Sequence, residues 1–255
     1  MMKSIVFTVT NDLTYDQRMI RICGTLADSG YDVMLVGRQE KDSIPITKQS
    51  FQQKRLHCWF PSGKLFYAEY NLRLLLFLLF KKADCVCAID LDTILACYFA
   101  SRIKRIPRVY DAHELFCEMK EVVTRAAVHR FWKRIEKFAV PRFSHAYTVN
   151  EFLASEFKKM YGSDVKVIRN LPRHQTLVIP EKKERYVLYQ GAVNEGRSFE
   201  TLIPAFTHIE IPFLVAGEGN FFEKCRELVR DAGLEHKVRF LGKIAPADLY
   251  HYTAG

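Results

Sequence analysis

Short apolar, β-branched runs alternate with longer amphipathic segments along the first two thirds of the chain. The pattern predicts strands at residues 4–10, 32–37, 84–88, 108–110, 146–149 and 165–168. It predicts helices between them at residues 16–29, 65–82, 93–103, 128–138 and 151–160. Because strands that alternate with helices of this length form βαβ units, we predict an α/β domain with a doubly wound parallel sheet. Ligands of such a domain bind at the carboxyl ends of the strands.

Residues 170–184 interrupt this alternation, with Pro172, Pro180 and a charged run from Glu181 to Arg185, and are predicted to be an interdomain linker. The alternation then restarts, with strands at 186–190, 213–216 and 238–241, helices at 199–209 and 221–232, and a helix start at Pro246. We therefore predict an N-terminal domain over residues 1–169 and a partial, incomplete C-terminal domain over 185–255.

Composition excludes several classes of protein. Of the 255 residues, 49% are hydrophobic and 26% are charged, which is ordinary for a globular protein with a buried core. The longest apolar run, residues 74–80, is far shorter than the ~20 residues of a transmembrane helix, and the N-terminus reads as a strand rather than a signal peptide. Seven cysteines without a CxxC pair indicate free thiols in a reducing compartment, which favours the cytoplasm.

The net charge of +9 is compatible with nucleic acid, anionic lipid or a phosphorylated substrate as partner. The cations are dispersed and carry no nucleic-acid-binding signature, so no nucleic acid is expected.

The stretch "VYDAHELF" places Asp111, His113 and Glu114 at the end of a predicted strand. Three interpretations are open: a metal site, a catalytic pocket, or a polar strand end. The remaining histidines supply no HxH or HExxH partner, so no metal is expected. Asp90 and Asp92 form a DxD after another strand. Such a pair can hold a divalent ion on a diphosphate, but capping a helix and lining a cleft are favoured here.

Five stretches carry a family resemblance: "NDLTYDQRMIRICGTLADSGYDVMLVGR", "IDLDTILACYFASRIKRIPRVYDAHELF", "YVLYQGAVNEGRSFETLI", "LVAGEGNFFEKCRELVRDAGL" and "VRFLGKIAPADLYHYT". In this order and spacing they resemble the retaining glycosyltransferases of family 4, in which two Rossmann-like domains with parallel sheets face a cleft (GT-B architecture). The resemblance implies transfer of a sugar from a nucleotide diphosphate sugar, with the acceptor on the first domain and the donor mainly on the second. It also implies acceptors that are glycans or lipid-linked, as in envelope polysaccharide synthesis.

The donor-binding residues are predicted in the second domain. In "QGAVNEGRSFE" a strand ends at Gly191 and a helix begins near Ser198, so backbone N–H groups and Arg197 are expected to bind the diphosphate, although Ala192 stands where the family has a further cation. In "AGEGNFF", Phe222 stands where a dinucleotide loop has its third glycine, which argues against NAD. The resemblance implies instead that Gly217 and Gly219 line the donor cleft and that Lys243 and Ile244 read the nucleobase edge.

The first domain is expected to supply the catalytic and acceptor-binding residues. The resemblance implies that His113 faces the donor sugar, with Asp111 or Glu114 fixing its tautomer. Acceptor binding is assigned to Asn11, Asp12, Asp16, Arg18, Asp90 and Asp92, and Asp16 is also a good N-cap.

Two glutamates eight residues apart, which grip the donor in the family, are implied downstream of Gly255. The chain as given lacks them, which favours inactivity or a non-catalytic role as a binding module for a nucleotide-sugar or a membrane surface. A metal-dependent, deacetylase-like hydrolase using Asp111 and His113 is the other alternative. No cofactor is expected beyond the nucleotide sugar as co-substrate.

Segments 65–82 and 128–142 mix large apolar residues with cations, as helices do that lie in a headgroup layer. Weak contact with an anionic membrane at its inner face is therefore an expectation. The competing interpretation is that residues 74–80, apolar all round, form a helix buried against the sheet.

Overall fold

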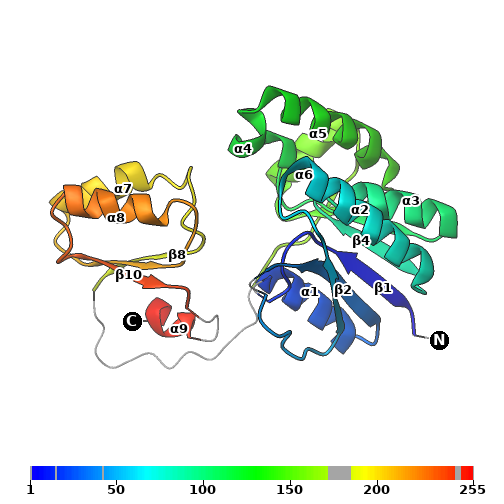
Figure 1. The fold of residues 1–255 in the computed structure, drawn as a ribbon, viewed down its shortest axis with the longest axis horizontal. Helices are drawn as coiled ribbons and strands as arrows, with labels where there is room; N and C mark the ends of the chain where they lie inside the picture. The colour runs from blue at the N-terminus through cyan, green and yellow to red at the C-terminus, as the bar shows by residue number, and fades with distance from the viewer. Residues whose placement is uncertain (1, 15, 42, 172–184, 245–247, 255) are drawn as a thin grey trace. The chain divides into compact units, whose positions relative to one another are not determined.

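The computed structural model describes residues 2–14, 16–41, 43–171, 185–244 and 248–254 (Figure 1). The chain divides into two compact units, Met1–Arg173 and His174–Gly255. The predicted linker lies outside the described residues from residue 172 onward, as does the predicted helix start at Pro246. Both units are α/β with parallel sheets, which confirms the predicted fold class.

The first unit contains a seven-stranded parallel sheet in the order β3-β2-β1-β4-β5-β6-β7. The strands are β1 (Ser4–Thr8), β2 (Asp32–Gln39), β3 (Gln52–His57), β4 (Cys85–Ile89), β5 (Arg108–Asp111), β6 (His145–Thr148) and β7 (Lys166–Val167). Strand order runs outward in both directions from the neighbouring β1 and β4. Their carboxyl ends therefore form the topological switch point, where ligands bind in sheets of this kind.

Helices cover both faces of this sheet (Figure 1). On one face, α1 (Gln17–Asp28) packs on β1 and β2, and the predicted N-cap Asp16 is confirmed because its carboxylate accepts from Met19 N at 3.0 Å. The other face carries α2 (Gly63–Phe80), α3 (Ile94–Lys104), α5 (Ala126–Ala139) and α6 (Glu151–Tyr161). The short elements η1 (Phe116–Glu118), α4 (Lys120–Val123) and η2 (Val140–Arg142) lead into and out of α5.

Residues 74–80 of α2 form a helix packed against the sheet, as the competing interpretation predicts, but only one side of the helix is buried. Leu74 and Leu78 are buried against the sheet, but Leu76 is exposed and Phe80 is 88% exposed. The sheet covers only one side of the helix, so an apolar residue on the other side has nothing to pack against within this unit. The helix is therefore apolar on its exposed face as well as on its buried face.

The second unit contains three parallel strands in the order β10-β9-β8. They are β8 (Val187–Gln190), β9 (Phe213–Ala216) and β10 (Val238–Gly242), joined by α7 (Phe199–Ala205) with η3 (Phe206–His208) and by α8 (Phe222–Asp231), and followed by α9 (Leu249–Ala254). The core of this unit includes Phe199, Phe206 and Phe213, and the rings of the last two are stacked with centroids 4.5 Å apart. The two loops that precede α7 and α8 are thereby set at one edge of the small sheet.

All seven cysteines are free thiols. Within the described part of the chain, no helix combines the length and the apolar character needed to cross a membrane.

Candidate functional site

The carboxyl ends of β1, β4 and β5 bring together polar side chains from three parts of the sequence. Thr10 follows β1, Asp90 and Asp92 follow β4, and His113 follows β5. The backbone holds these ends in register, since Asp90 N donates to Asp111 O at 2.9 Å. These residues therefore lie around the switch point of the sheet, where the sequence predicted a site.

Asp111 is held by Arg18, not by His113. Arg18 Nη1 and Nη2 donate to the two carboxylate oxygens of Asp111, each at 2.6 Å, and the Asp111 side chain is completely buried. The prediction that Asp111 fixes the tautomer of His113 is therefore wrong, whereas acceptor binding by Arg18 stays a prediction. The same contacts disfavour Asp111 as a metal ligand, because both of its oxygens already face a guanidinium.

Asp90 is the carboxyl group at the imidazole. His113 Nδ1 lies 3.2 Å from Asp90 Oδ1, and among the described residues neither atom has another hydrogen-bond partner. Burial raises the pKa of Asp90 well above its usual range, and the nearby carboxylates Asp92 and Glu114 raise it further. Burial also lowers the pKa of His113, and the charge of Arg18 acts in the same direction. Burial therefore favours the neutral form of both groups, and the two atoms lie within reach of a hydrogen bond.

Asp90 has a strained backbone, with φ of +56° in the left-handed region. A residue other than glycine in this region costs about 1–2 kcal/mol, and such strain concentrates at functional sites. The strain coincides here with the unusual carboxyl–imidazole contact.

Asp92 accepts a hydrogen bond from the hydroxyl of Thr10, while its backbone oxygen accepts from Asn71 Nδ2 at 2.8 Å. Burial raises the pKa of Asp92 to about 6, against the opposing effect of the Thr10 bond. The residue that begins α3 is Thr93, whose side chain makes no capping hydrogen bond. Asp92 therefore ties the end of β4 to the end of β1.

Asp90, His113 and Glu114 are the one group of three among the described residues whose ligand atoms could surround a metal ion, all within 4.8 Å of one another. The expectation that no metal is used stays a prediction.

The remaining first-unit candidates have structural partners. Asp12 accepts from Thr14 N and from Arg55 Nη2, each at 2.9 Å, which closes the loop after β1. Asn11 Nδ2 lies 3.5 Å from Asp16 Oδ2, and Asn11 O accepts from Arg38 N at 3.0 Å. Acceptor binding by these residues stays a prediction.

Two loops of the second unit, 191–198 and 217–221, are tied together. Gly191 N donates to Ala216 O at 3.0 Å, and a Cβ on Gly217 would lie 1.8 Å from Gly191 O. A Cβ on Gly219 would lie 2.3 Å from Val193 O. Both glycines are thus required by the close approach of the loops, which is a structural reason for "GEG" beside the predicted ligand role.

Asn194 and Asn220, which the sequence did not single out, connect the same loops. Asn194 Oδ1 accepts from Asn220 N at 3.1 Å, and Asn220 Oδ1 accepts from Glu195 N at 3.0 Å. Asparagine often accepts from a nearby backbone N–H in turns, which is the only signal that could have marked these two.

The predicted cations lie at this edge as well. Lys243 Nζ is 3.8 Å from Glu218 Oε2. Arg197 is exposed and directly precedes Ser198, the N-cap residue of α7. Helix α7 has only seven residues, so its dipole is weak, and an anion would depend on backbone N–H groups and on Arg197 more than on the helix. Ile244 is half-buried beyond β10.

Comparisons with known proteins agree on this fold. Among solved structures, the chain is similar to a lipopolysaccharide outer core galactosyltransferase in its apo form (TM-score 0.63, 14% identity, 100% of this chain and 72% of that one). It is also similar to sucrose-phosphate synthase from Thermosynechococcus elongatus (0.76, 15%, 99% and 74%) and to Anabaena HepE in complex with UDP and glucose (0.66, 16%, 95% and 70%). These likenesses show the GT-B fold. No curated protein matches the chain. The family described as Glycosyltransferase Family 4 matches residues 17–171, more than half of the chain. The protein therefore belongs to glycosyltransferase family 4.

Proposed function

We propose that this protein transfers a sugar from a nucleotide diphosphate sugar to an acceptor hydroxyl, with retention of the anomeric configuration. The observation that carries the proposal is the contact between His113 and Asp90 at the switch point of the first unit. The contact places an imidazole at the ligand-binding edge of a domain that belongs to glycosyltransferase family 4.

His113 would act as a hydrogen-bond donor through Nε2. If protonated Asp90 donates a hydrogen bond to Nδ1, the neutral imidazole must carry its own proton on Nε2, which fixes the tautomer. A neutral donor in a desolvated site stabilises charge that develops on a sugar oxygen without repelling an oxocarbenium-like centre. Asp90 would thus position His113, the role for which Asp111 or Glu114 was predicted.

The donor is proposed to bind to the second unit. Structural neighbours were solved in complex with UDP and with UDP-glucose, which favours a uridine nucleotide. The backbone at Gly191, Gly217 and Gly219, with Arg197, would hold the diphosphate, and Lys243 with Ile244 would meet the base. Close approach of backbone N–H groups to phosphate needs residues without side chains, as at these glycines.

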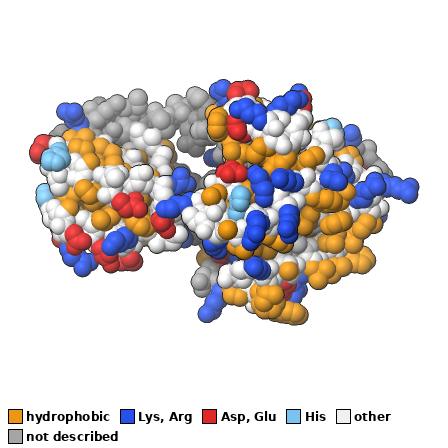
Figure 2. Space-filling model, turned by 90° about the horizontal axis from the view of Figure 1, so that it is seen from above, with side chains coloured by type: hydrophobic (Ala, Val, Ile, Leu, Met, Phe, Trp, Pro, Cys, Tyr) orange, Lys and Arg blue, Asp and Glu red, His pale blue; other side chains and the backbone are white. Residues whose placement is uncertain are grey.

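The proposed acceptor is a glycan or lipid-linked sugar of envelope polysaccharide synthesis, used at the inner face of the membrane by a cytoplasmic protein. Exposed Leu65, Leu72, Leu76 and Phe80 fall on one face of α2, with Lys81 and Lys82 directly after it. Figure 2 displays hydrophobic side chains and cations close together on the first unit. A helix of this kind can lie in the headgroup layer of an anionic membrane.

Calorimetry and product analysis test this proposal. UDP-, GDP- and ADP-glucose are titrated into the full gene product, and the anomeric configuration of any product is read by NMR. His113→Ala should lower kcat at least ~100-fold, as expected for loss of a group that acts in the transition state, and leave nucleotide affinity within about twofold. Activity should also survive chelation of divalent metals.

The matched control is His145→Ala, at the opposite, amino end of its strand β6. It should change neither kcat nor nucleotide affinity. Absence of binding by all three nucleotides, or an unchanged kcat in the His113 variant, contradicts the proposal. A non-catalytic binding module would instead bind nucleotide and release no product.

A further inference from the structure

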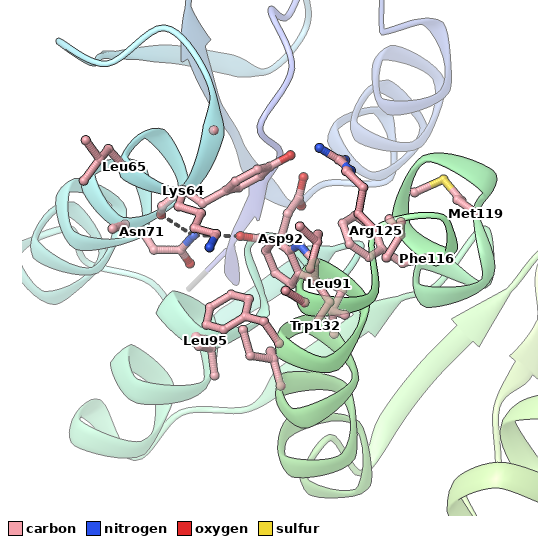
Figure 3. Close-up of a pocket in the computed structure, with 18 residues that line it drawn as sticks. Lys64, Leu65, Asn71, Leu91, Asp92, Leu95, Phe116, Met119, Arg125 and Trp132 are labelled. Atoms are coloured by element: carbon pink, nitrogen blue, oxygen red, sulfur yellow. Dashed lines mark hydrogen bonds between the residues drawn. The ribbon is translucent and has the colours of Figure 1, made fainter. Parts of the chain in front are cut away.

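A large cavity opens in the first unit beside the candidate site. It has a volume of about 770 Å³ and lies between the start of α2, the segment after β4, and the α4–α5 region. Figure 3 shows Asn71 of α2 on one side, Phe116 and Trp132 on the other, and Leu91 and Asp92 between them. Its size falls within the ~300–1,000 Å³ of typical small-molecule sites.

The lining of the cavity is mostly hydrocarbon. Leu95, Phe116, Val122, Trp132 and Ile135 are among the lining residues. Because the cavity opens to the surface, its hydrocarbon lining contacts solvent unless a ligand covers it, and burying such apolar surface is favourable. The cavity therefore fits an apolar ligand better than it fits a structural role.

The cavity also has polar groups, and they are placed at its ends. Lys64 and Arg125 line it and are exposed, so they stand at its mouth. Asp92 lines the cavity at its inner end, next to the switch point of the sheet. The contact between Asp90 and His113 lies at the same switch point, outside the cavity lining. The two cations favour a ligand with an anionic head, since ammonium and guanidinium groups both bind phosphate.

Asn71 adds an unsatisfied acceptor. Its Nδ2 donates to Tyr67 O and Asp92 O, but its Oδ1 is buried and accepts no hydrogen bond from any described residue. A buried acceptor without a partner is costly unless a ligand or water supplies a donor. Asn71 is itself one of the residues that line the cavity, and its Nδ2 faces Asp92.

The apolar lining continues onto the surface of the protein. Leu65 and Phe131 both line the cavity, yet they are 59% and 54% exposed. Leu65 is also the first residue of the exposed apolar face of α2, with Leu72 and Leu76 further along the same face. A hydrocarbon chain could therefore pass from a membrane into the cavity without crossing a polar surface.

We propose that this cavity binds the hydrocarbon chain of a lipid phosphate, with the phosphate at Lys64 and Arg125. The inference rests on the proposed function, because the lipid phosphate would be the part of the acceptor that carries the sugar. It narrows the proposed acceptor to the lipid-linked class. The hydrocarbon chain lies between the walls formed by α2 and α5, and the phosphate stays at the mouth with Lys64 and Arg125.

Binding can be tested on the 255-residue chain without any nucleotide. The protein has two tryptophans, Trp59, which is 77% exposed, and Trp132, which is 7% exposed and lines the cavity. In a Trp59→Phe background, emission therefore reports on the cavity alone. The probes are octyl, decyl and dodecyl phosphate below their micelle concentrations, dodecanol, and inorganic phosphate.

The expected result is a saturable change in Trp132 emission with alkyl phosphates, and binding that tightens by up to about fourfold for each added methylene while the cavity has room. Inorganic phosphate should neither change the emission nor compete. No saturation, no dependence on chain length, or full competition by inorganic phosphate would overturn the inference.

Variants separate the head from the chain. Lys64→Glu should weaken the binding of dodecyl phosphate at least tenfold and leave the affinity for dodecanol unchanged. Lys54→Glu, the same charge change at an exposed residue outside the cavity, should alter neither. Ala68→Phe places a ring in the cavity and should weaken both ligands. Equal effects of Lys64→Glu and Lys54→Glu would contradict a phosphate site at the mouth, and that result needs no cavity-filling variant to fold.

The two proposals fail separately. Loss of the lipid site with intact nucleotide binding leaves sugar transfer standing and removes the lipid acceptor. Tight lipid binding without nucleotide binding leaves the cavity and removes the transferase.

Discussion

The buried pair between Arg18 and Asp111 gives the sharpest prediction about the first unit. Arg18 donates to both carboxylate oxygens of Asp111 at 2.6 Å. The side chain of Arg18 is 11% exposed and that of Asp111 is 0% exposed. Removing the cation leaves a carboxylate in the interior, which typically costs about 3–5 kcal/mol. We therefore expect Arg18→Met to lower the free energy of unfolding by about 4 kcal/mol.

A double-mutant cycle isolates the interaction. Asp111→Asn keeps the shape and should cost about 2–3 kcal/mol, because Arg18 can still reach water at its exposed part. The double variant buries no unpaired charge, so it should cost about 1–3 kcal/mol less than the sum of the single variants. Urea unfolding followed by tryptophan fluorescence reports on this unit, since both tryptophans lie in it.

The exposed pair Lys159–Glu156 is the matched control. Its N–O distance is also 2.6 Å, but Lys159 is 70% exposed, so Lys159→Met should cost under about 1 kcal/mol. A cost of Arg18→Met as small as that of the control, or strictly additive costs in the cycle, would refute the argument that burial decides the energy. As a second readout, the pKa of His113 should rise in Arg18→Met, because the charge that lowers it is gone.

Two further predictions concern the pH response of the first unit and the loops of the second. Because the pKa of Asp92 is raised from 3.8 to about 6 by burial, its folded form binds the proton more tightly, so stability is lost as pH rises from about 4 to about 6. Asp92→Asn should reduce that loss by about 3 kcal/mol in urea unfolding at pH 4 and pH 7, and a difference under about 0.5 kcal/mol would contradict it. In Gly217→Ala the new Cβ would collide with Gly191 O, and alanine would have to adopt a φ of +147°. In Gly233→Ala the φ is also positive, but the Cβ has open space, so Gly217→Ala should lower the melting temperature of the second unit far more. Equal shifts in calorimetry would show that the loop contact is not required.

The sequence predicts the parallel sheets well because their central strands are buried on both faces and read as continuous apolar runs. Strand β3 was missed for the opposite reason. Its residues, "QQKRLH", lie at the edge of the sheet and alternate only weakly between solvent and protein. An edge strand is often charged, which removes the hydrophobic signal that marks the others.

The sequence predicts where the candidate site lies, but not which of its side chains contact one another. The carboxyl ends of β1, β4 and β5 must meet in a doubly wound sheet, so the positions of Asp90 and His113 follow from the strand pattern. Which carboxyl faces which cation depends on contacts between residues far apart. Arg18 and Asp111 are 93 positions apart, and no local pattern distinguishes Asp111 from Asp90 as the partner of an arginine.

The distribution of charge at the switch point bears on what can bind there. Of the three aspartates around it, only Asp111 has a bidentate arginine, and burial raises the pKa of Asp90 and Asp92. Because Arg18 balances the charge of Asp111 and burial disfavours charge on Asp90, this edge carries less negative charge at neutral pH than three unpaired carboxylates would, and it repels a diphosphate less. The guanidinium of Arg18 is already paired with Asp111. This pairing favours the proposal that the glycine loops of the second unit bind the diphosphate, and that His113 and the aspartates meet the sugar.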